Sequence, residues 1–244
     1  MNKRHLAAAL GIISLLIIVA IAFFYNRNIE QQEALRRQQE LWKAEYPTIY
    51  LRNDNFQVQI GMFGLYGTKS ADIVMLGNSH TYYANWSELL DTEGIVNRGI
   101  VGDITAGYLH RLRYVYDLTP KLCFLEGGVN DLYANYTVKT IAQHFRQILD
   151  TLQTHRITPV ITATFYVSKR WPNAALKNAE IASLNDSLRA LCVDRDIIFL
   201  DINPTIAPNG FLDEAKTYDG IHLNSIGYSA WSSAIRHVLD KTKR

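Results

Sequence analysis

Short apolar runs alternate with helical patterns along most of this chain, and this alternation constrains the fold more than any other feature. The apolar runs cover residues 72–76, 95–97, 122–125, 159–164 and 197–202. The helical patterns lie near residues 85–91, 105–117, 138–155, 174–195 and 225–241. Strands that are apolar on both faces and alternate with helices form a parallel sheet covered on both sides. The sequence therefore predicts an α/β domain with a five-stranded parallel sheet over residues 71–244.

The N-terminal region contains an uncharged apolar stretch at residues 6–24, preceded by Lys3 and Arg4. At about 1.5 Å per residue, it nearly crosses a hydrocarbon core of roughly 30 Å. The alternative is a cleaved signal peptide, because residues 20–22 read Ala-Ile-Ala, a small-x-small cleavage pattern. The run is longer than a usual signal core, which favours a transmembrane anchor. In both cases we expect the domain outside the cytoplasm, periplasmic or extracellular, and secreted if the segment is cleaved.

Residues 1–25 are thus an anchor or signal segment, and residues 26–70 are expected to form a polar stalk and lead-in to the domain. The first part, residues 26–44, is rich in Gln, Glu and Arg and predicts a solvated helix. Further on, Phe56, Val58 and Ile60 alternate with polar residues. That alternation predicts a short strand or an extended segment.

Charge and cysteine content exclude some classes of partner and leave one question open. The formal net charge is +2, and Lys and Arg are scattered rather than gathered in a basic stripe. We therefore expect no nucleic-acid partner. Cys123 falls in a predicted core strand and Cys192 on the apolar face of a predicted helix. Buried unpaired thiols are the simpler interpretation, but a disulfide between them stays open.

Four short segments carry the polar groups of a single predicted site. They are Gly-Asn-Ser-His at residues 77–80, Asn-Arg-Gly-Ile-Val-Gly-Asp at 97–103, Gly-Gly-Val-Asn-Asp at 127–131 and Asp-Gly-Ile-His at 219–222. The first three follow the first three apolar runs, and the fourth lies between the fifth run and the last helix. Parallel sheets bind ligands beyond the carboxyl ends of their strands. The four segments are therefore expected to meet at that edge.

Ser79, His222 and Asp219 have the chemistry of a nucleophile, its base and the group that orients the base. A serine hydroxyl is unreactive at neutral pH without an adjacent base. With two residues between them, Asp219 and His222 can turn to one side, so that the carboxylate holds one ring nitrogen and the other faces Ser79. The simpler interpretation of Ser79 is a helix N-cap, which is compatible with this role.

In this order the segments resemble the SGNH hydrolases, the GDSL-type lipase and esterase family, in the branch similar to platelet-activating-factor acetylhydrolase. The resemblance implies a flavodoxin-like three-layer sandwich and a serine esterase. No cofactor is expected, and no metal either, because the remaining histidines lie in helical patterns without ligand-like spacing. The resemblance also implies an oxyanion hole made by Ser79, Gly102 and Asn130. The chain departs from the family pattern in carrying Asn78 where most relatives have Asp, and His80 where Leu, Ile or Thr is usual.

Aromatic residues follow the same predicted strands and suggest the substrate. We expect substrate contacts from His80, Tyr82, Tyr83, Trp86, Tyr133 and Trp171. Such walls suit the face of a sugar better than a long acyl chain, which would need an aliphatic channel. The predicted substrate is a short-chain ester, acetyl in the simplest case, of a carbohydrate or similar polar alcohol.

Three alternatives remain open on the same fold. An O-acyltransferase would share the first half of the reaction, and a lysophospholipase or thioesterase would share all of the catalytic groups. A non-catalytic, membrane-anchored binding domain would have no use for Ser79, Asp219 and His222 together, which argues against it.

Overall fold

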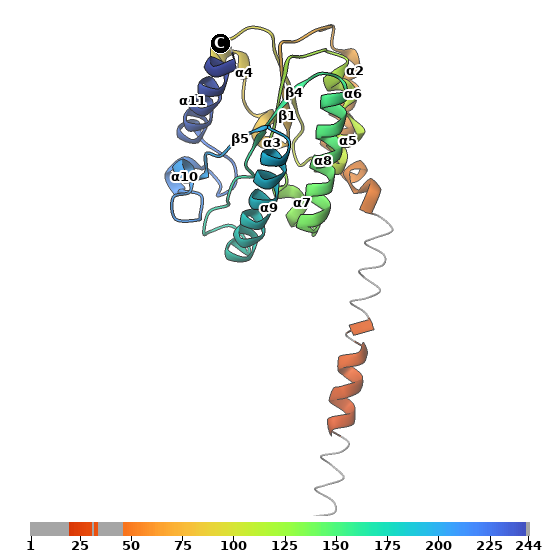
Figure 1. The fold of residues 1–244 in the computed structure, drawn as a ribbon. Coiled ribbons are helices and arrows are strands. Elements are labelled where there is room, and N and C mark those ends of the chain that lie inside the picture. The colour runs from red at the N-terminus through yellow and green to blue at the C-terminus, as the bar shows by residue number, and fades with distance from the viewer. Residues whose placement is uncertain (1–19, 31, 34–45, 243–244) are drawn as a thin grey trace, which may run out of the picture. The chain divides into compact units, whose positions relative to one another are not determined.

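In the computed structural model, a parallel sheet of five strands forms the centre of the fold (Figure 1). The strands are β1 (Ile73–Gly77), β2 (Ile95–Gly99), β3 (Leu122–Leu125), β4 (Thr158–Thr162) and β5 (Ile198–Leu200). They run parallel in the order β2-β1-β3-β4-β5, which is the flavodoxin-like arrangement. The predicted α/β class and five-stranded parallel sheet are confirmed.

Helices cover both faces of this sheet. Figure 1 shows α4 (Trp86–Leu90), α10 (Asn203–Ile206) and α11 (Ser225–Thr242) on one side, and α5 (Thr105–His110), α6 (Arg113–Tyr116) and α8 (Val138–Thr154) on the other. Helix α9 (Ala174–Asp194) packs beside α8. The single helix expected over residues 105–117 is divided into α5 and α6. The division leaves Arg111 between them, with its side chain fully buried.

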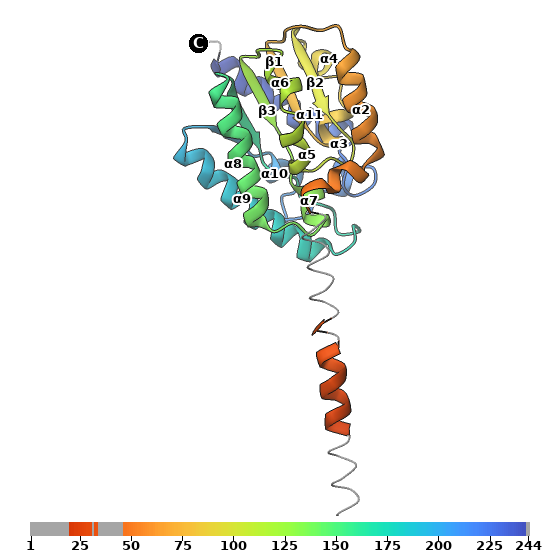
Figure 2. The same ribbon diagram turned by 90° about the vertical axis from the view of Figure 1, so that its right-hand side faces the viewer.

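Short helices at the carboxyl ends of the strands bring the predicted site segments together. Helix α3 (Ser79–Tyr82) follows β1, and α7 (Val129–Tyr133) follows β3. Figure 2 shows α3, α5 and α7 near the same end of the strands. The register pairs Gly77 with Gly99 and Leu76 with Leu125, so β1, β2 and β3 end level with one another.

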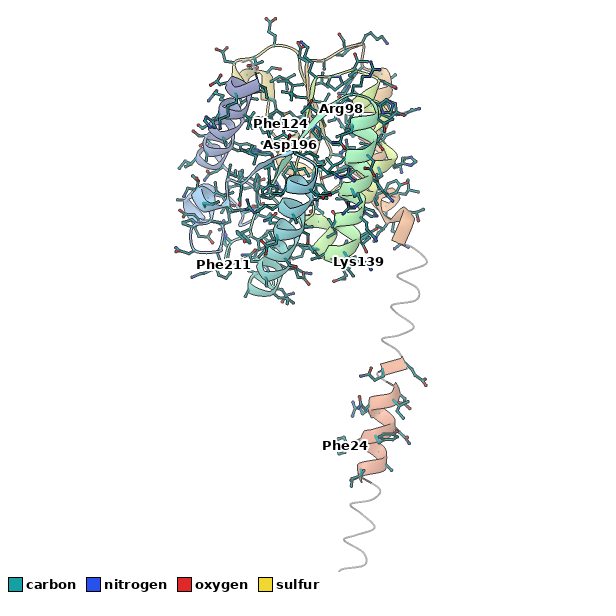
Figure 3. The ribbon with its side chains drawn as sticks, viewed as in Figure 1. Phe24, Arg98, Phe124, Lys139, Asp196 and Phe211 are labelled. Atoms are coloured by element: carbon teal, nitrogen blue, oxygen red, sulfur yellow. The ribbon has the colours of Figure 1, made fainter. Side chains whose placement is uncertain are left out.

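The core between the sheet and helices α4 and α11 is built around aromatic rings. The ring centroid of Trp231 lies 4.8 Å from that of Trp86 and 4.9 Å from that of Phe165. Phe124 of β3, labelled in Figure 3, belongs to the same buried cluster. The expectation that Trp86 contacts substrate is wrong, since its side chain is only 1% exposed. Its indole N–H donates to the carbonyl of Thr81 instead.

The segment before the sheet is a helix rather than the predicted short strand or extended segment. A short 3-10 helix, η1 (Tyr46–Arg52), leads into α2 (Asp54–Leu65). Phe56 and Phe63 are buried two helical turns apart, whereas Val58 is exposed. Three residues alternating with polar ones were too short a window to separate a strand from one face of a helix. The compact unit accordingly begins at Tyr50, within the predicted lead-in.

The structure describes residues 20–30, 32–33 and 46–242. Residues 20–30 are helical, with Phe24 among their exposed side chains. Within the described parts of the chain, no helix is long and apolar enough to cross a membrane. The expected membrane segment, residues 6–24, lies outside the described residues except for its end at 20–24, so the anchor stays a prediction. Cys123 and Cys192 are both buried and free.

Replacing Trp231 by alanine tests the aromatic core. Because the indole is fully buried among other rings, Trp231→Ala should lower the free energy of unfolding by about 3–5 kcal/mol. Urea unfolding of the full chain measures this. The control is Val193→Ala on the surface of α9, where the side chain is 79% exposed and the change should stay within about 0.5 kcal/mol. Equal effects of the two substitutions would contradict the packing described.

Candidate active site

The turn from β1 into α3 presents Ser79 at the carboxyl edge of the sheet. The strand ends at Gly77, and Asn78 takes the N-cap position, where its Oδ1 accepts the backbone N–H of His80 at 2.9 Å. Ser79 is the first residue of the helix. Because Asn78 supplies the cap, the hydroxyl of Ser79 is not engaged as an N-cap and lies 2.9 Å from Nε2 of His222.

The loop before α11 is folded so that Asp219 and His222 face the same way. Asp219 Oδ1 accepts the backbone N–H groups of Ile221 and His222, at 3.0 and 2.8 Å. Its other oxygen, Oδ2, lies 2.6 Å from Nδ1 of His222. An antiparallel bridge between Thr217 and Leu223 closes the loop. The two-residue spacing therefore lets one carboxylate shape the loop and hold the imidazole.

The charge of Asp219 determines which ring nitrogen of His222 is available to Ser79. Partial burial raises the pKa of Asp219, but the hydrogen bonds from the His222 ring and from the two backbone N–H groups outweigh it, so the pKa falls below its usual value. A charged carboxylate accepts the proton on Nδ1, which leaves Nε2 as an acceptor for the Ser79 hydroxyl. The three side chains form one chain of hydrogen bonds.

Gly102 and Asn130 lie on either side of Ser79 because of the strand order. Gly102 follows β2 and Asn130 follows β3, and β1 lies between those two strands. Gly102 has a φ of +71°, a conformation that favours glycine. Asn130 Nδ2 donates to the carbonyl of Asp103 at 2.9 Å, which links Asn130 to the residue after Gly102. The backbone N–H of Ser79, in the first turn of α3, has no acceptor within the helix.

A fully buried ion pair holds this edge of the sheet in place. Arg111 Nε donates to Asp103 Oδ2 at 2.7 Å. Its Nη1 donates to the carbonyl of Arg98 at 2.6 Å, and its Nη2 to that of Gly77 at 2.9 Å. One guanidinium therefore connects the ends of β1 and β2 with the loop that carries Gly102. No role was predicted from the sequence for either residue of the pair: Asp103 ends the second site segment without an assigned function, and Arg111 lies outside all four segments.

Two exposed tyrosines flank the imidazole of His222. Tyr218 stacks on the ring, with centroids 5.7 Å apart and planes at 13°. Tyr83 meets it edge-on, with centroids 5.4 Å apart. Tyr83 was expected at the substrate rim, whereas Tyr218 was missed, although its position directly before Asp219 could have indicated it. Tyr82 is exposed on α3 beside Tyr83.

The remaining predicted substrate contacts divide into a rim pair and a buried residue. Tyr133 and Trp171 lie edge-to-face with centroids 6.5 Å apart, and the Tyr133 hydroxyl donates to the carbonyl of Pro172. The loop that carries Trp171 reaches the His222 loop, since Ser168 N–H donates to the Gly220 carbonyl. His80 is only 1% exposed, so the expectation that it lines the substrate pocket is wrong.

Comparison with known sequences gives a family match over most of the chain. The GDSL-like Lipase/Acylhydrolase family matches residues 66–230. Among curated proteins, an N-acylneuraminate cytidylyltransferase from Streptococcus agalactiae serotype V is 27% identical over 175 residues, which is 72% of this chain. The chain spans only 40% of the length of that relative.

Solved structures show the same fold. A proposed acylhydrolase from Bacteroides fragilis has a TM-score of 0.67 and 27% identity, with 78% of this chain and 98% of that chain covered. An acetyl xylan esterase has a TM-score of 0.60 and 18% identity, with 68% and 98% covered.

Next to Asn130, a second buried carboxyl makes stability depend on pH. Asp131 accepts the backbone N–H and the hydroxyl of Thr105. Burial raises its pKa from 3.8 to about 7, and the Thr105 hydrogen bonds only partly oppose that. Between these two values the folded protein holds a proton that the unfolded chain has lost. Raising the pH through this window therefore lowers the free energy of unfolding contributed by Asp131.

Asp131→Asn keeps a neutral polar group in place and should remove this part of the pH dependence. The measurement is urea unfolding of the full chain at several values from about pH 4 to about pH 7. The wild type should lose stability relative to the variant as the pH rises. Asp194→Asn, at an exposed position on α9, should run parallel to the wild type. Parallel curves for Asp131→Asn would contradict the buried carboxyl described.

Proposed function

Because the chain belongs to the GDSL-like lipase/acylhydrolase family and is therefore an ester-bond hydrolase, we propose that Ser79, His222 and Asp219 are its catalytic triad. The observation that carries this proposal is the chain of hydrogen bonds from Ser79 Oγ to His222 Nε2, at 2.9 Å, and from His222 Nδ1 to Asp219 Oδ2, at 2.6 Å. Each atom has the partner that its role requires.

In the proposed first step, Ser79 Oγ attacks the ester carbonyl carbon while its proton passes to His222 Nε2. The carbonyl π electrons move to oxygen, which becomes an oxyanion. The backbone N–H groups of Ser79 and Gly102 and the amide of Asn130 donate to that oxygen. Preorganised donors of this kind are worth about 3 kcal/mol each. The hydrogen bond from Asn130 to the Asp103 carbonyl fixes the amide before substrate arrives.

The intermediate then collapses and the acyl group stays on Ser79. The bond from carbon to the alcohol oxygen breaks, and His222 returns its proton to that oxygen. Water next attacks the acyl-enzyme, with His222 taking the proton from water and giving it to Ser79 Oγ as the acid leaves. Asp219 stabilises the imidazolium in both halves of the reaction.

We further propose that the substrate is a short-chain ester, acetyl in the simplest case, of a sugar or similar polar alcohol. Tyr218 is 60% exposed and stacked on His222, so its outer face and that of Tyr83 are available to a sugar ring next to the reacting atoms. The curated relative is named for an acyl sugar, N-acylneuraminate, and the acetyl xylan esterase shares this fold. The apolar residues 6–24 would hold such a domain at a membrane, outside the cytoplasm.

The triad predicts different losses for the base and its orienting group. His222→Ala removes the base and should lower kcat on the order of 10⁶-fold, and Asp219→Ala on the order of 10⁴-fold. Hydrolysis of a short-chain aryl ester by the full chain measures both. His237→Ala, at an exposed histidine of α11, should leave kcat unchanged. A wild-type rate for His222→Ala would rule out the proposed triad.

The substrate class predicts a preference for acetyl groups and a role for Tyr218. The value of kcat/KM should be higher for acetyl than for octanoyl esters, and Tyr218→Ala should raise KM for an acetylated oligosaccharide about tenfold with little change for an aryl acetate. Tyr116→Ala is the matched control, because Tyr116 also stacks on a histidine, His155, away from the site. Values of kcat/KM that rise with acyl length would indicate a lipase or lysophospholipase. Acyl transfer to a sugar faster than hydrolysis would indicate an acyltransferase.

A further inference from the structure

The residue after the proposed nucleophile, His80, is buried and joined to the loop that carries His222. Its Nε2 lies 2.9 Å from the carbonyl oxygen of Ile221, a residue 141 positions away in the sequence. A carbonyl oxygen can only accept a hydrogen bond, so Nε2 must carry the proton. Ile221 directly precedes His222. The imidazole of His80 therefore donates to the backbone of the residue next to the proposed base.

Glu126, at the end of β3, faces the other ring nitrogen of His80. Its Oε2 lies 3.6 Å from Nδ1, and both side chains are 1% exposed. Burial lowers the pKa of His80. The charge of Glu126, the hydrogen bond to the Ile221 carbonyl and the charge of Asp219 outweigh this effect, so the pKa is raised. A proton on Nδ1 faces the carboxylate and one on Nε2 faces the carbonyl. Both ring nitrogens thus have a partner that favours a proton.

We propose that His80 is a positioning residue, whose Nε2–H holds the Ile221 carbonyl and thereby sets the place of His222 relative to Ser79. Glu126 lies at the opposite side of the ring, with its carboxylate 3.6 Å from Nδ1. This inference rests on the proposed function, because it assumes that His222 acts as the base. It gives His80 a role in place of the substrate contact predicted from its position after Ser79.

The other hydrogen bonds of the loop show what the His80 bond adds. Those from Ile221 and His222 to Asp219 are local, as is the one from Thr217 Oγ1 to the His222 carbonyl. The bond from the Ser168 N–H to the Gly220 carbonyl joins the loop to the segment after β4. These bonds shape the loop, but they do not place it against α3. The His80 bond joins the loop to the same short helix that begins with Ser79.

Helix α11 and the core hold His80 itself in position. The hydroxyl of Tyr228, on α11, donates to the His80 carbonyl at 2.6 Å. The ring of Phe165 meets the imidazole edge-on, with centroids 5.2 Å apart. Because His80 is fixed on several sides, its Nε2–H is a rigidly placed donor for the Ile221 carbonyl. Loss of this donor would let the His222 loop move. A misplacement of about 1 Å at such a site can cost on the order of 100-fold in rate.

Two amide substitutions separate this role from simple packing. In His80→Gln the side-chain amide nitrogen can reach the place of Nε2 and donate to the Ile221 carbonyl. In His80→Asn the amide is one methylene shorter and reaches only the place of Nδ1. We expect His80→Gln to keep kcat within about threefold of the wild type. His80→Asn should lower kcat about 10- to 100-fold, with KM changed less than about twofold, since His80 does not touch substrate.

The experiment measures kcat and KM of the full chain on an aryl acetate, with melting temperatures to show that the variants are folded. His155→Gln is the control, because Nδ1 of His155 also bonds a backbone carbonyl, that of Thr151, away from the site, and the glutamine amide reaches the place of Nε2 rather than Nδ1. Equal losses in His80→Gln and His80→Asn, a wild-type kcat in His80→Asn, or a change confined to KM would overturn the proposal. An inactive wild type would contradict the proposed function rather than this inference.

The wild-type protein gives a second test that does not depend on a folded variant. Nitrogen-15 NMR of the histidine rings reports which ring nitrogens carry protons. The His80 signals are assigned by their loss in His80→Gln. If that variant does not fold, they are assigned by nuclear Overhauser contacts with Phe165 protons. The proposal requires a protonated Nε2 that exchanges slowly with water. An unprotonated Nε2 at neutral pH would overturn it.

Discussion

The buried ion pair of Asp103 and Arg111 is the interaction on which the geometry of the site depends. Burying two charges is costly unless each is paired and fully hydrogen-bonded. Arg111 meets this condition because its fork of donors reaches the Asp103 carboxylate and the carbonyls of Arg98 and Gly77. These partners belong to the loop after β2 and to the ends of β2 and β1. The guanidinium of Arg111 therefore fixes those three segments together. Removing Arg111 would leave a buried carboxylate without its partner.

The site is assembled from two parts of the fold, the edge of the sheet and the loop that carries His222, and different interactions hold each part in place. The sheet edge supplies Ser79, Gly102 and Asn130, and its rigidity comes from strand pairing and from Arg111. The base comes from a loop far along the chain, shaped by Asp219 through local hydrogen bonds. These two parts must meet within the length of a hydrogen bond for Ser79 and His222 to exchange a proton. The buried contact between His80 and Ile221 lies where they meet.

The sheet and the site segments could be predicted from the sequence because their signals are local. All five residues of β1 are buried, so a continuous apolar run marks the strand. Asp219 and His222 are recognisable because their spacing is a property of one short loop. Trp86, which we expected at the rim, shows the limit of this reasoning. Its burial depends on Trp231, which belongs to the last helix.

His80 and Arg111 could not be interpreted from the sequence for the same reason. The role of each depends on backbone carbonyls brought near by the fold, at Ile221 for His80 and at Gly77 and Arg98 for Arg111. The neighbouring residues in the sequence give no indication of these carbonyl partners. Helix α2 stands where a short strand or an extended segment was predicted, because three alternating apolar residues are too few to distinguish a strand from one face of a helix.

Covalent labelling of Ser79 tests the central claim most directly. An organophosphonate probe forms a stable adduct only with a serine that has an adjacent base and donors for the developing oxyanion. Mass spectrometry of the labelled full chain should find one adduct, on the peptide that contains Ser79, and none in Ser79→Ala. The absence of an adduct on Ser79, or an adduct on another serine that persists in Ser79→Ala, would contradict the proposed site.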